Sequence, residues 1–270
     1  MRSKRILTMQ DLSCVGQCSL TVALPVLSAY GVETCALPTA ILSNHTAFEK
    51  WSCLDLTPEM NHIMAAWREN GFKFDAFLLG YLGSADIMNI AKVCFRDFAA
   101  DGAKIIIDPV FGDNGKLYPA FDKGYVAAMA DLIESADIIL PNLTEACFLT
   151  ETEYKANDSV ETAKKAVLRL AERTNAAIVV TGVEQGGRIG ELIYSDEEFT
   201  EIWAEKLSHH FNGTGDLFAS VFTAVYLKSG DMRAACEAAG AFVAESIRAT
   251  DASHTYGVNF EYALNHRKQQ

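Results

Sequence analysis

The sequence predicts an α/β protein, a three-layer α/β/α sandwich built on a mostly parallel central sheet. Short apolar runs typical of buried strands alternate with longer helical patterns along almost the whole chain, and such alternation favours parallel strands joined by helices. Unusual polar residues follow several predicted strands, at the edge of the sheet where α/β proteins bind ligands. The sequence holds no internal repeat, low-complexity segment or linker, so we expect residues 1–270 to form a single domain.

The predicted strands are short apolar runs, most of them ended by a polar residue, proline or glycine. In chain order they are Arg5–Met9, Thr34–Pro38, Ala76–Leu79, Lys104–Ile107, Asp137–Leu140 and Ala177–Thr181. Two further runs without an intervening helix predict a hairpin near one edge of the sheet, formed by Arg188–Tyr194 and Phe199–Leu207.

The predicted helices carry apolar residues at helical spacing, and several are closed by glycine. In chain order they are Ser19–Tyr30, Leu56–Asn70, Ala85–Ala100, Lys123–Ser135, Ser159–Thr174, Asp216–Lys228 and Met232–Thr250. We expect Thr57 to cap the second of these helices, with Pro58 at its first position, and Ser159 to cap the fifth.

Charge and cysteine content limit the classes of partner and compartment. The formal net charge of -12 argues against a nucleic-acid or anionic-membrane partner, because those partners are bound mainly through Lys and Arg. The seven cysteines form no CxxC pair, which favours buried thiols in a reducing compartment. The N-terminal residues do not resemble a signal peptide, and no apolar run approaches 18 residues. We therefore expect a cytoplasmic protein.

A glycine turn directly before a helix is the strongest chemical signal. Gly213, Thr214 and Gly215 let the backbone come close to a ligand, and the helix that follows presents free N–H groups to an anion. The Asp216 carboxylate would repel an anion at this turn, so its presence there calls for a function. One such function is to act as a base toward a hydroxyl that attacks a phosphate. The alternative is that Thr214 or Asp216 only caps the helix.

Acidic residues follow two other predicted strands. Asp108 and Asp113 stand five residues apart after a buried run, and Glu145 comes three residues after Asn142. Carboxylates near phosphates commonly hold Mg²⁺, often through water. The alternative for the second group is a helix cap formed by Asn142, with Glu145 in the first helical turn.

Two motifs place polar groups beside aromatic rings. The segment 43–46 reads Ser-Asn-His-Thr and precedes an aromatic pair, while Tyr81 stands between glycines in the segment 80–84. Such surroundings suit a planar heteroaromatic ligand. The alternative for segment 43–46 is an ordinary surface loop.

Together and in order, these motifs resemble those of pyridoxal kinases, the vitamin B6 kinases of the ribokinase superfamily. The resemblance spans roughly residues 5–250 and rests on several motifs. Ser-Asn-His-Thr and Gly-Tyr-Leu-Gly-Ser are specific to B6 kinases, whereas Gly-Thr-Gly-Asp is shared by the superfamily. The resemblance implies a ribokinase-like fold, usually homodimeric, that transfers the γ-phosphoryl of ATP to the 5′-hydroxyl of pyridoxal, pyridoxine or pyridoxamine. It implies Mg²⁺ as well and leaves a monovalent cation open.

The resemblance also implies roles for individual residues. Asp216 looks like the catalytic base, and Gly213, Thr214 and Gly215 look like the anion hole. Residues implied to contact the vitamer are Asp11, Thr46, Tyr81 and Tyr118, the last in a loop over 112–119 that closes over substrate. Residues implied to lie near ATP are Asp108, Asn142, Thr181, Thr214 and Gly215. Residues implied to hold the metal are Asp113 and Glu145.

Three positions depart from the family pattern. Asp11 stands where many relatives have Ser, and a carboxylate there favours a cationic substrate group, so we expect a shift toward pyridoxamine. Leu140 replaces Thr and Gly182 replaces a small polar residue, and both departures concern the ATP contacts. The alternatives are a hydroxymethylpyrimidine kinase of the same superfamily and a non-catalytic B6-binding protein, whose signature would be a lost base or anion hole.

Overall fold

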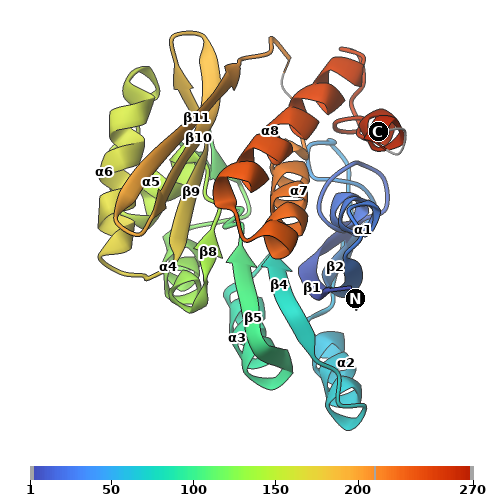
Figure 1. The fold of residues 1–270 in the computed structure, drawn as a ribbon. Coiled ribbons are helices and arrows are strands. Elements are labelled where there is room, and N and C mark those ends of the chain that lie inside the picture. Colours follow the sequence, from blue (N-terminus) through green and yellow to red (C-terminus); the bar gives the residue numbers. More distant parts are fainter. Residues whose placement is uncertain (1–2, 210, 268–270) are drawn as a thin grey trace. The chain divides into compact units, whose positions relative to one another are not determined.

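The structure is a computed structural model that describes residues 3–209 and 211–267. The chain divides into two compact units, one made of residues 1–74 and 207–270 and the other of residues 75–206. Within each unit, strands alternate with helices in the chain order shown by the colours of Figure 1.

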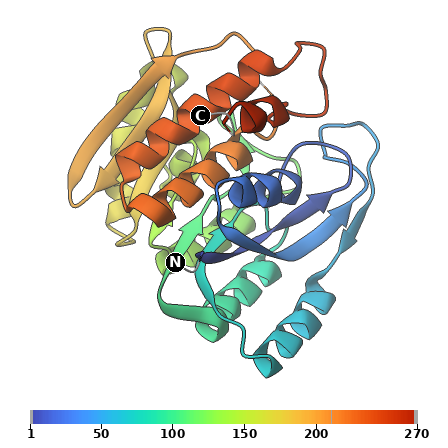
Figure 2. The same cartoon turned by 45° about the vertical axis from the view of Figure 1, so that its right-hand side comes forward.

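The first unit combines three strands from the start of the chain with helices from both ends. Strand β1 (Arg5–Ser13) pairs in parallel with β2 (Glu33–Leu42), and β3 (Cys53–Asp55) pairs antiparallel with β2. Its helices are α1 (Leu20–Ala29), α2 (Thr57–Glu69), α7 (Thr214–Ser229), α8 (Met232–Ala249) and α9 (Glu261–Arg267). Helix α7 packs against α1 and α8, and both views of the ribbon show α7 and α8 side by side (Figures 1 and 2).

In the second unit, the strands of the large sheet follow the order β11-β10-β9-β8-β5-β4. These strands are β4 (Phe74–Leu79), β5 (Ala99–Ile107), β8 (Ile138–Ile139), β9 (Ala177–Gln185), β10 (Arg188–Ser195) and β11 (Glu198–Glu205). Its helices are α3 (Ala85–Phe98), α4 (Lys123–Leu132), α5 (Leu143–Leu149) and α6 (Ser159–Ala171). Strand β8 pairs in parallel with β5 and β9. Strands β10 and β11 form the predicted edge hairpin, and β10 also pairs antiparallel with β9.

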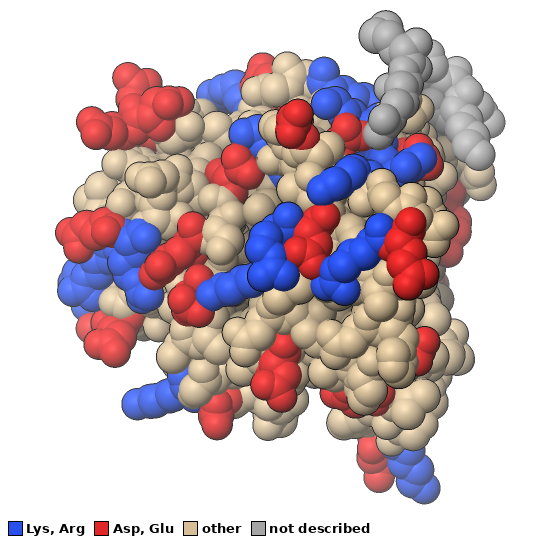
Figure 3. All heavy atoms as spheres, turned by 90° about the horizontal axis from the view of Figure 1, so that it is seen from below, with Lys and Arg blue, Asp and Glu red and all other residues tan. Residues whose placement is uncertain are grey.

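These features confirm the predicted fold class, an α/β fold with a large, mostly parallel sheet flanked by helices. The strand sequences are apolar because their side chains are buried. No surface is exposed, for example, at Ile106, Ile107 and Ile139. No helix within residues 3–209 and 211–267 is long and apolar enough to cross a membrane. On the face drawn in Figure 3, basic and acidic side chains are interspersed, so that face carries no continuous basic patch.

Two predicted caps are wrong. Helix α2 begins at Thr57 itself, whose N–H donates to Oδ1 of Asp55 at 2.7 Å. The N-cap of α6 is Asp158, because the Ser159 hydroxyl accepts a hydrogen bond from the Glu184 N–H at 3.0 Å instead of capping its own helix. The elements that the sequence did not predict include β3, α5, α9 and the hairpin of β6 (Gly112–Asp113) with β7 (Lys116–Leu117).

Candidate active site

The glycine turn forms the N-terminus of α7. Gly213 is the N-cap residue with φ 82°, and no side chain caps the helix, so neither Thr214 nor Asp216 serves as the cap. A Cβ atom at Gly213 would lie 2.0 Å from the backbone oxygen of Gln17. Both the positive φ and this close approach require glycine. The uncapped N–H groups of the turn therefore remain available to an anion.

The Asp216 carboxylate points back toward the start of α1. Its Oδ2 accepts a hydrogen bond of 2.9 Å from the main-chain N–H of Ser19. Burial raises the pKa of Asp216 to about 6, the N–H of Ser19 opposes this rise, and the charge of Asp11 adds to it. A carboxyl whose pKa lies near neutrality suits a general base.

Asp11 lies inside β1 and not after it. It stands where the register between β1 and β2 shifts, between Gln10 and Leu12, and such irregularities often redirect a side chain near a functional site. The residue is 4% exposed, and its Oδ2 accepts a hydrogen bond of 3.0 Å from Oγ of Ser13. Burial raises the pKa of Asp11, while the Ser19 and Ser13 side chains lower it.

No ion pair with a basic side chain compensates Asp11 or Asp216 among the described residues. Cys18, the neighbouring thiol, has its pKa raised to about 12 by burial and by the charges of both carboxylates, so it stays protonated. Two partly buried carboxylates without a cation form a site that favours a cationic ligand group.

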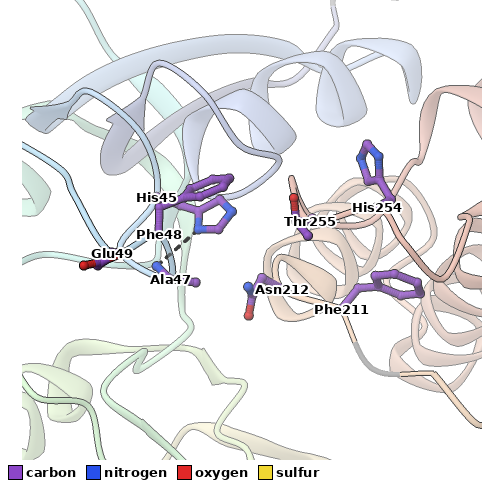
Figure 4. Close-up of a pocket in the computed structure, with 9 residues that line it drawn as sticks. His45, Ala47, Phe48, Glu49, Phe211, Asn212, His254 and Thr255 are labelled. Atoms are coloured by element: carbon purple, nitrogen blue, oxygen red, sulfur yellow. Dashed lines mark hydrogen bonds between the residues drawn. The ribbon is translucent and has the colours of Figure 1, made fainter.

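A cavity of about 410 Å³ lies in the same unit, beside the glycine turn (Figure 4). His45 and Phe48 line one side, and Asn212 and Thr255 lie on the other. The Nδ1 atom of His45 accepts a hydrogen bond from the Ala47 N–H at 3.2 Å, so the proton of the neutral ring sits on Nε2. This Nε2 is buried and has no hydrogen-bond partner among the described residues. A buried donor without a partner is costly, and a ligand acceptor would satisfy it.

Sequence reasoning selected Thr46 from this motif and missed His45. Thr46 is exposed and does not line the cavity, whereas His45 is 6% exposed and its ring lies 4.5 Å from that of Phe48. The sequence did show polar residues near aromatic ones in this motif. Only the hydrogen bonds of the folded chain show that Nε2 of His45 has no partner among the described residues.

In the second unit, Asp108 directly follows β5 as predicted, and Glu145 lies in the first turn of α5. Asn142 and Glu145 form a capping box: the Asn142 N–H donates to Oε2 at 2.9 Å, and Asn142 Oδ1 accepts from the Glu145 N–H at 3.0 Å. Oε1 of Glu145 also accepts from the N–H groups of Phe111 (3.0 Å) and Gly112 (3.4 Å). Burial raises the pKa of Glu145, and these three N–H donors oppose the rise. The helix-cap alternative is therefore present in the structure, and Glu145 also orders the start of segment 112–119.

Segment 112–119, predicted as a loop, contains the two-residue strands β6 and β7. Asn114 and Gly115 have φ values of 51° and 75°, the geometry of a tight hairpin turn. Both carboxylate oxygens of Asp113 accept hydrogen bonds from Asn114. Tyr118, just past the hairpin, is 37% exposed.

Thr181 and Gly182 lie inside β9, although the sequence predicted that this strand ends at Thr181. The strand continues because its second half pairs antiparallel with β10. Thr181 donates its N–H to the carbonyl of Pro141 at 2.9 Å and forms a bridge with Asn142, so two predicted ATP-site residues are neighbours. Tyr81 is half-buried, with its ring 5.3 Å from that of Phe121, and Leu140 is buried.

Comparisons with known proteins give the family. A model of the phosphomethylpyrimidine kinase family matches residues 22–260. A pyridoxal kinase of Leifsonia xyli is 30% identical, over 86% of this chain and 84% of the relative. The structure of pyridoxal kinase from Lactobacillus plantarum has a TM-score of 0.89 and 32% identity, covering 97% of this chain and 96% of that one. A Bacteroides thetaiotaomicron protein solved with pyridoxal has a TM-score of 0.92 and 36% identity, covering 99% and 96%.

The fold and the glycine turn thus define the class, an α/β kinase of the ribokinase-like superfamily. The chain belongs to the phosphomethylpyrimidine kinase family, and its similarity to proteins named pyridoxal kinase confirms the resemblance stated from the sequence motifs. The prediction of a kinase enzyme is confirmed with it.

Proposed function

We propose that this chain transfers the γ-phosphoryl of ATP to the 5′-hydroxyl of a vitamin B6 vitamer. Residues 1–270 act as a single kinase domain in this proposal, consistent with a family match that runs from residue 22 to residue 260. The observation that carries the proposal is the half-buried carboxylate of Asp216 beside an uncapped helix N-terminus. Phosphoryl transfer needs such a pairing of a group that takes the hydroxyl proton with donors for the transferring anion.

In this account Asp216 is the base, and the N–H groups of Gly213, Thr214 and Gly215 hold the phosphoryl oxygens. The raised pKa of Asp216 supports the assignment, because a base near neutrality both accepts a proton and is ionised at working pH. The αL conformation of Gly213 presents the turn without a side chain in the way.

The resemblance assigns the vitamer contacts to Asp11, Thr46, Tyr81 and Tyr118. His45 is added to the predicted set, since its unpartnered Nε2–H would donate to an acceptor on the ring. Thr46 and Tyr81 keep the ring-contacting roles that the resemblance implies, and Tyr118 keeps its place in the loop over 112–119 that closes over substrate. Asp11 would pair with a protonated ring nitrogen or an amino substituent, because no basic side chain among the described residues compensates its charge.

The resemblance assigns ATP and Mg²⁺ to Asp108, Asp113, Asn142, Glu145 and Thr181, and it also assigns Thr214 and Gly215 to ATP. The donor set fits Mg²⁺ held mostly by water and phosphate oxygens, because the described residues hold no cluster of three metal-ligating side chains. Asp113 and Glu145 would both act mainly through water, since both oxygens of each carboxylate already accept hydrogen bonds. When bound, Mg²⁺ supplies positive charge at the transferring phosphoryl. A homodimer remains part of the proposal on the strength of the resemblance, which leaves a monovalent cation open, and a cytoplasmic location remains part of it on the strength of the cysteine content and the N-terminal residues.

The test is a substrate panel with ATP. Purified native protein is incubated with pyridoxal, pyridoxine, pyridoxamine and hydroxymethylpyrimidine, and the phosphorylated products are identified by mass spectrometry. We expect 5′-phosphates of the B6 vitamers at rates well above that of hydroxymethylpyrimidine. Efficient phosphorylation of hydroxymethylpyrimidine alone would favour the alternative kinase. Tight vitamer binding without ATP consumption would favour the binding-protein alternative.

The same panel tests the vitamer preference. With a carboxylate at position 11, kcat/KM for pyridoxamine should exceed that for pyridoxal. Replacing Asp11 by Ser should remove the preference while phosphorylation continues. Equal or better use of pyridoxal by the native protein, unchanged in Asp11→Ser, would contradict the role of Asp11 and leave the kinase assignment intact.

A further inference from the structure

Resting on the proposed role of Asp216, we propose that Ser19 is a positioning residue for the catalytic base. Ser19 holds Asp216 through its main-chain N–H, in a backbone conformation that L-residues rarely adopt. The two residues are 197 positions apart in the chain, and both belong to the first unit.

The conformation of Ser19 is the first observation. Its φ of 50° and ψ of −128° lie in a region that favours glycine, yet the residue is serine and only 5% exposed. Residues in such conformations persist only where the surroundings impose them, and they cluster at functional sites. In this conformation the main-chain N–H of Ser19 donates a hydrogen bond of 2.9 Å to Oδ2 of Asp216.

The second observation is that Ser19 does not do what a serine at this position usually does. It is the N-cap of α1, where serine is favoured because its hydroxyl accepts from the first helical turn. The Ser19 hydroxyl makes no capping hydrogen bond, and the Ser19 side chain lowers the pKa of Asp11 instead.

The third observation is that α1 fixes the position of this donor. The carbonyl of Ser19 accepts from the N–H groups of Val22 (3.1 Å) and Ala23 (2.9 Å), and Val22 and Ala23 are fully buried. Helix α1 packs against α7, which carries Asp216. The donor and acceptor therefore sit on two packed helices, so the carboxylate is held in one orientation before substrate binds.

The test compares two variants at this position. Ser19→Gly keeps the N–H but frees the backbone, and Ser19→Ala keeps the restricted backbone and removes only the hydroxyl. We expect kcat to fall roughly tenfold in Ser19→Gly, with KM for the vitamer nearly unchanged and Tm not lower than native, because misplacing a reactive group slows chemistry while strain is relieved. Ser19→Ala should stay within about threefold of native kcat, since the N–H and its direction remain.

The matched control is Asp231→Gly, a substitution at the N-cap of α8, where the Asp231 side chain does cap by accepting from the Ala234 N–H at 3.0 Å. This variant should lower Tm and leave kcat unchanged. A Ser19→Gly enzyme with native kcat, or one that loses kcat and Tm together as an ordinary capping defect would, overturns the proposal.

Amide hydrogen exchange of the native protein tests the contact without any activity. The Ser19 amide should exchange faster in Asp216→Ala than in native protein, while Asp216→Asn, which keeps an acceptor oxygen, should preserve the protection. Unchanged Ser19 exchange in Asp216→Ala overturns the proposal, even if Ser19→Gly does not fold. Native-like turnover in Asp216→Asn would instead overturn the assignment of Asp216 as base, so the two failures are distinguishable.

Discussion

The main-chain N–H of Ser19 donates a 2.9 Å hydrogen bond to Oδ2 of Asp216, and this contact joins the start of α1 to the helix that follows the glycine turn. The N–H stabilises the ionised carboxylate, whereas burial and the charge of Asp11 disfavour it. The balance raises the pKa of Asp216 to about 6.

The first prediction concerns pH. A base must be deprotonated, so kcat/KM should be constant above about pH 7 and fall roughly tenfold per unit as pH drops below the pKa of Asp216, near 6. Asp11→Asn removes the neighbouring negative charge and should move this limb to lower pH. Rate profiles from pH 5 to 8 measure both effects. A native rate that stays constant down to pH 5, or a limb unmoved in Asp11→Asn, would show that Asp216 and its neighbour Asp11 do not control the rate.

The glycine turn gives a matched pair of substitutions on one helix. Gly213 at the start of α7 and Gly230 at its end have φ of 82° and 70°, but only a Cβ at Gly213 would clash, 2.0 Å from the oxygen of Gln17. Gly213→Ala should lower kcat by about 10²-fold or more, because the anion donors must shift. Gly230→Ala should cost about 1 kcal/mol of stability with no kinetic effect. Equal kinetic losses in the two variants would mean that strain, not the position of the turn, limits the rate.

His45 should contribute to vitamer binding and not to the chemical step. His45→Phe fills the same space but removes the Nε2–H that lacks a partner, so KM for the vitamer should rise roughly tenfold while kcat changes little. The Tm should not fall, because an unsatisfied buried donor is removed. Steady-state kinetics with His62→Phe as an exposed control checks this. A native KM in His45→Phe would place the vitamer away from the cavity in Figure 4.

A prediction about stability concerns Glu191 in β10, far in sequence from the motifs. Burial raises the pKa of Glu191 to about 7. The folded state then binds this proton more tightly than the unfolded state, so stability is lost as pH rises from about 4.5 to about 7. Glu191→Gln should therefore be more stable than native protein by about 1–3 kcal/mol at pH 8 and no more stable at pH 4. Denaturant unfolding at both pH values measures this, with Glu198→Gln as the exposed control; a benefit that persists at pH 4 would assign it to packing.

Sequence patterns predicted those features that depend on local chain chemistry. The buried run before Asp108 ends at that residue as expected, and the glycine turn lies at the start of α7. The hairpin of β6 and β7 could also have been predicted, because Asn114-Gly115 is a strong signal for a tight hairpin turn.

Other features depend on contacts between distant segments and could not be predicted. The pairing of β9 with β10 carries the strand beyond Thr181, and the second role of Ser159 depends on Glu184. The free donor of His45 is recognisable only after every neighbour is known. Likewise, the hydrogen bond from Ser19 to Asp216 joins residues separated by most of the chain, and no local sequence pattern predicts it.

The most direct test of the central claim is single-turnover phosphorylation of a B6 vitamer by native protein and by Asp216→Asn. We predict that Asp216→Asn binds vitamer and ATP with near-native affinity but forms 5′-phosphate at least about 10³-fold more slowly, since the base is lost and the anion donors remain. Near-native formation of the 5′-phosphate by Asp216→Asn would contradict the account.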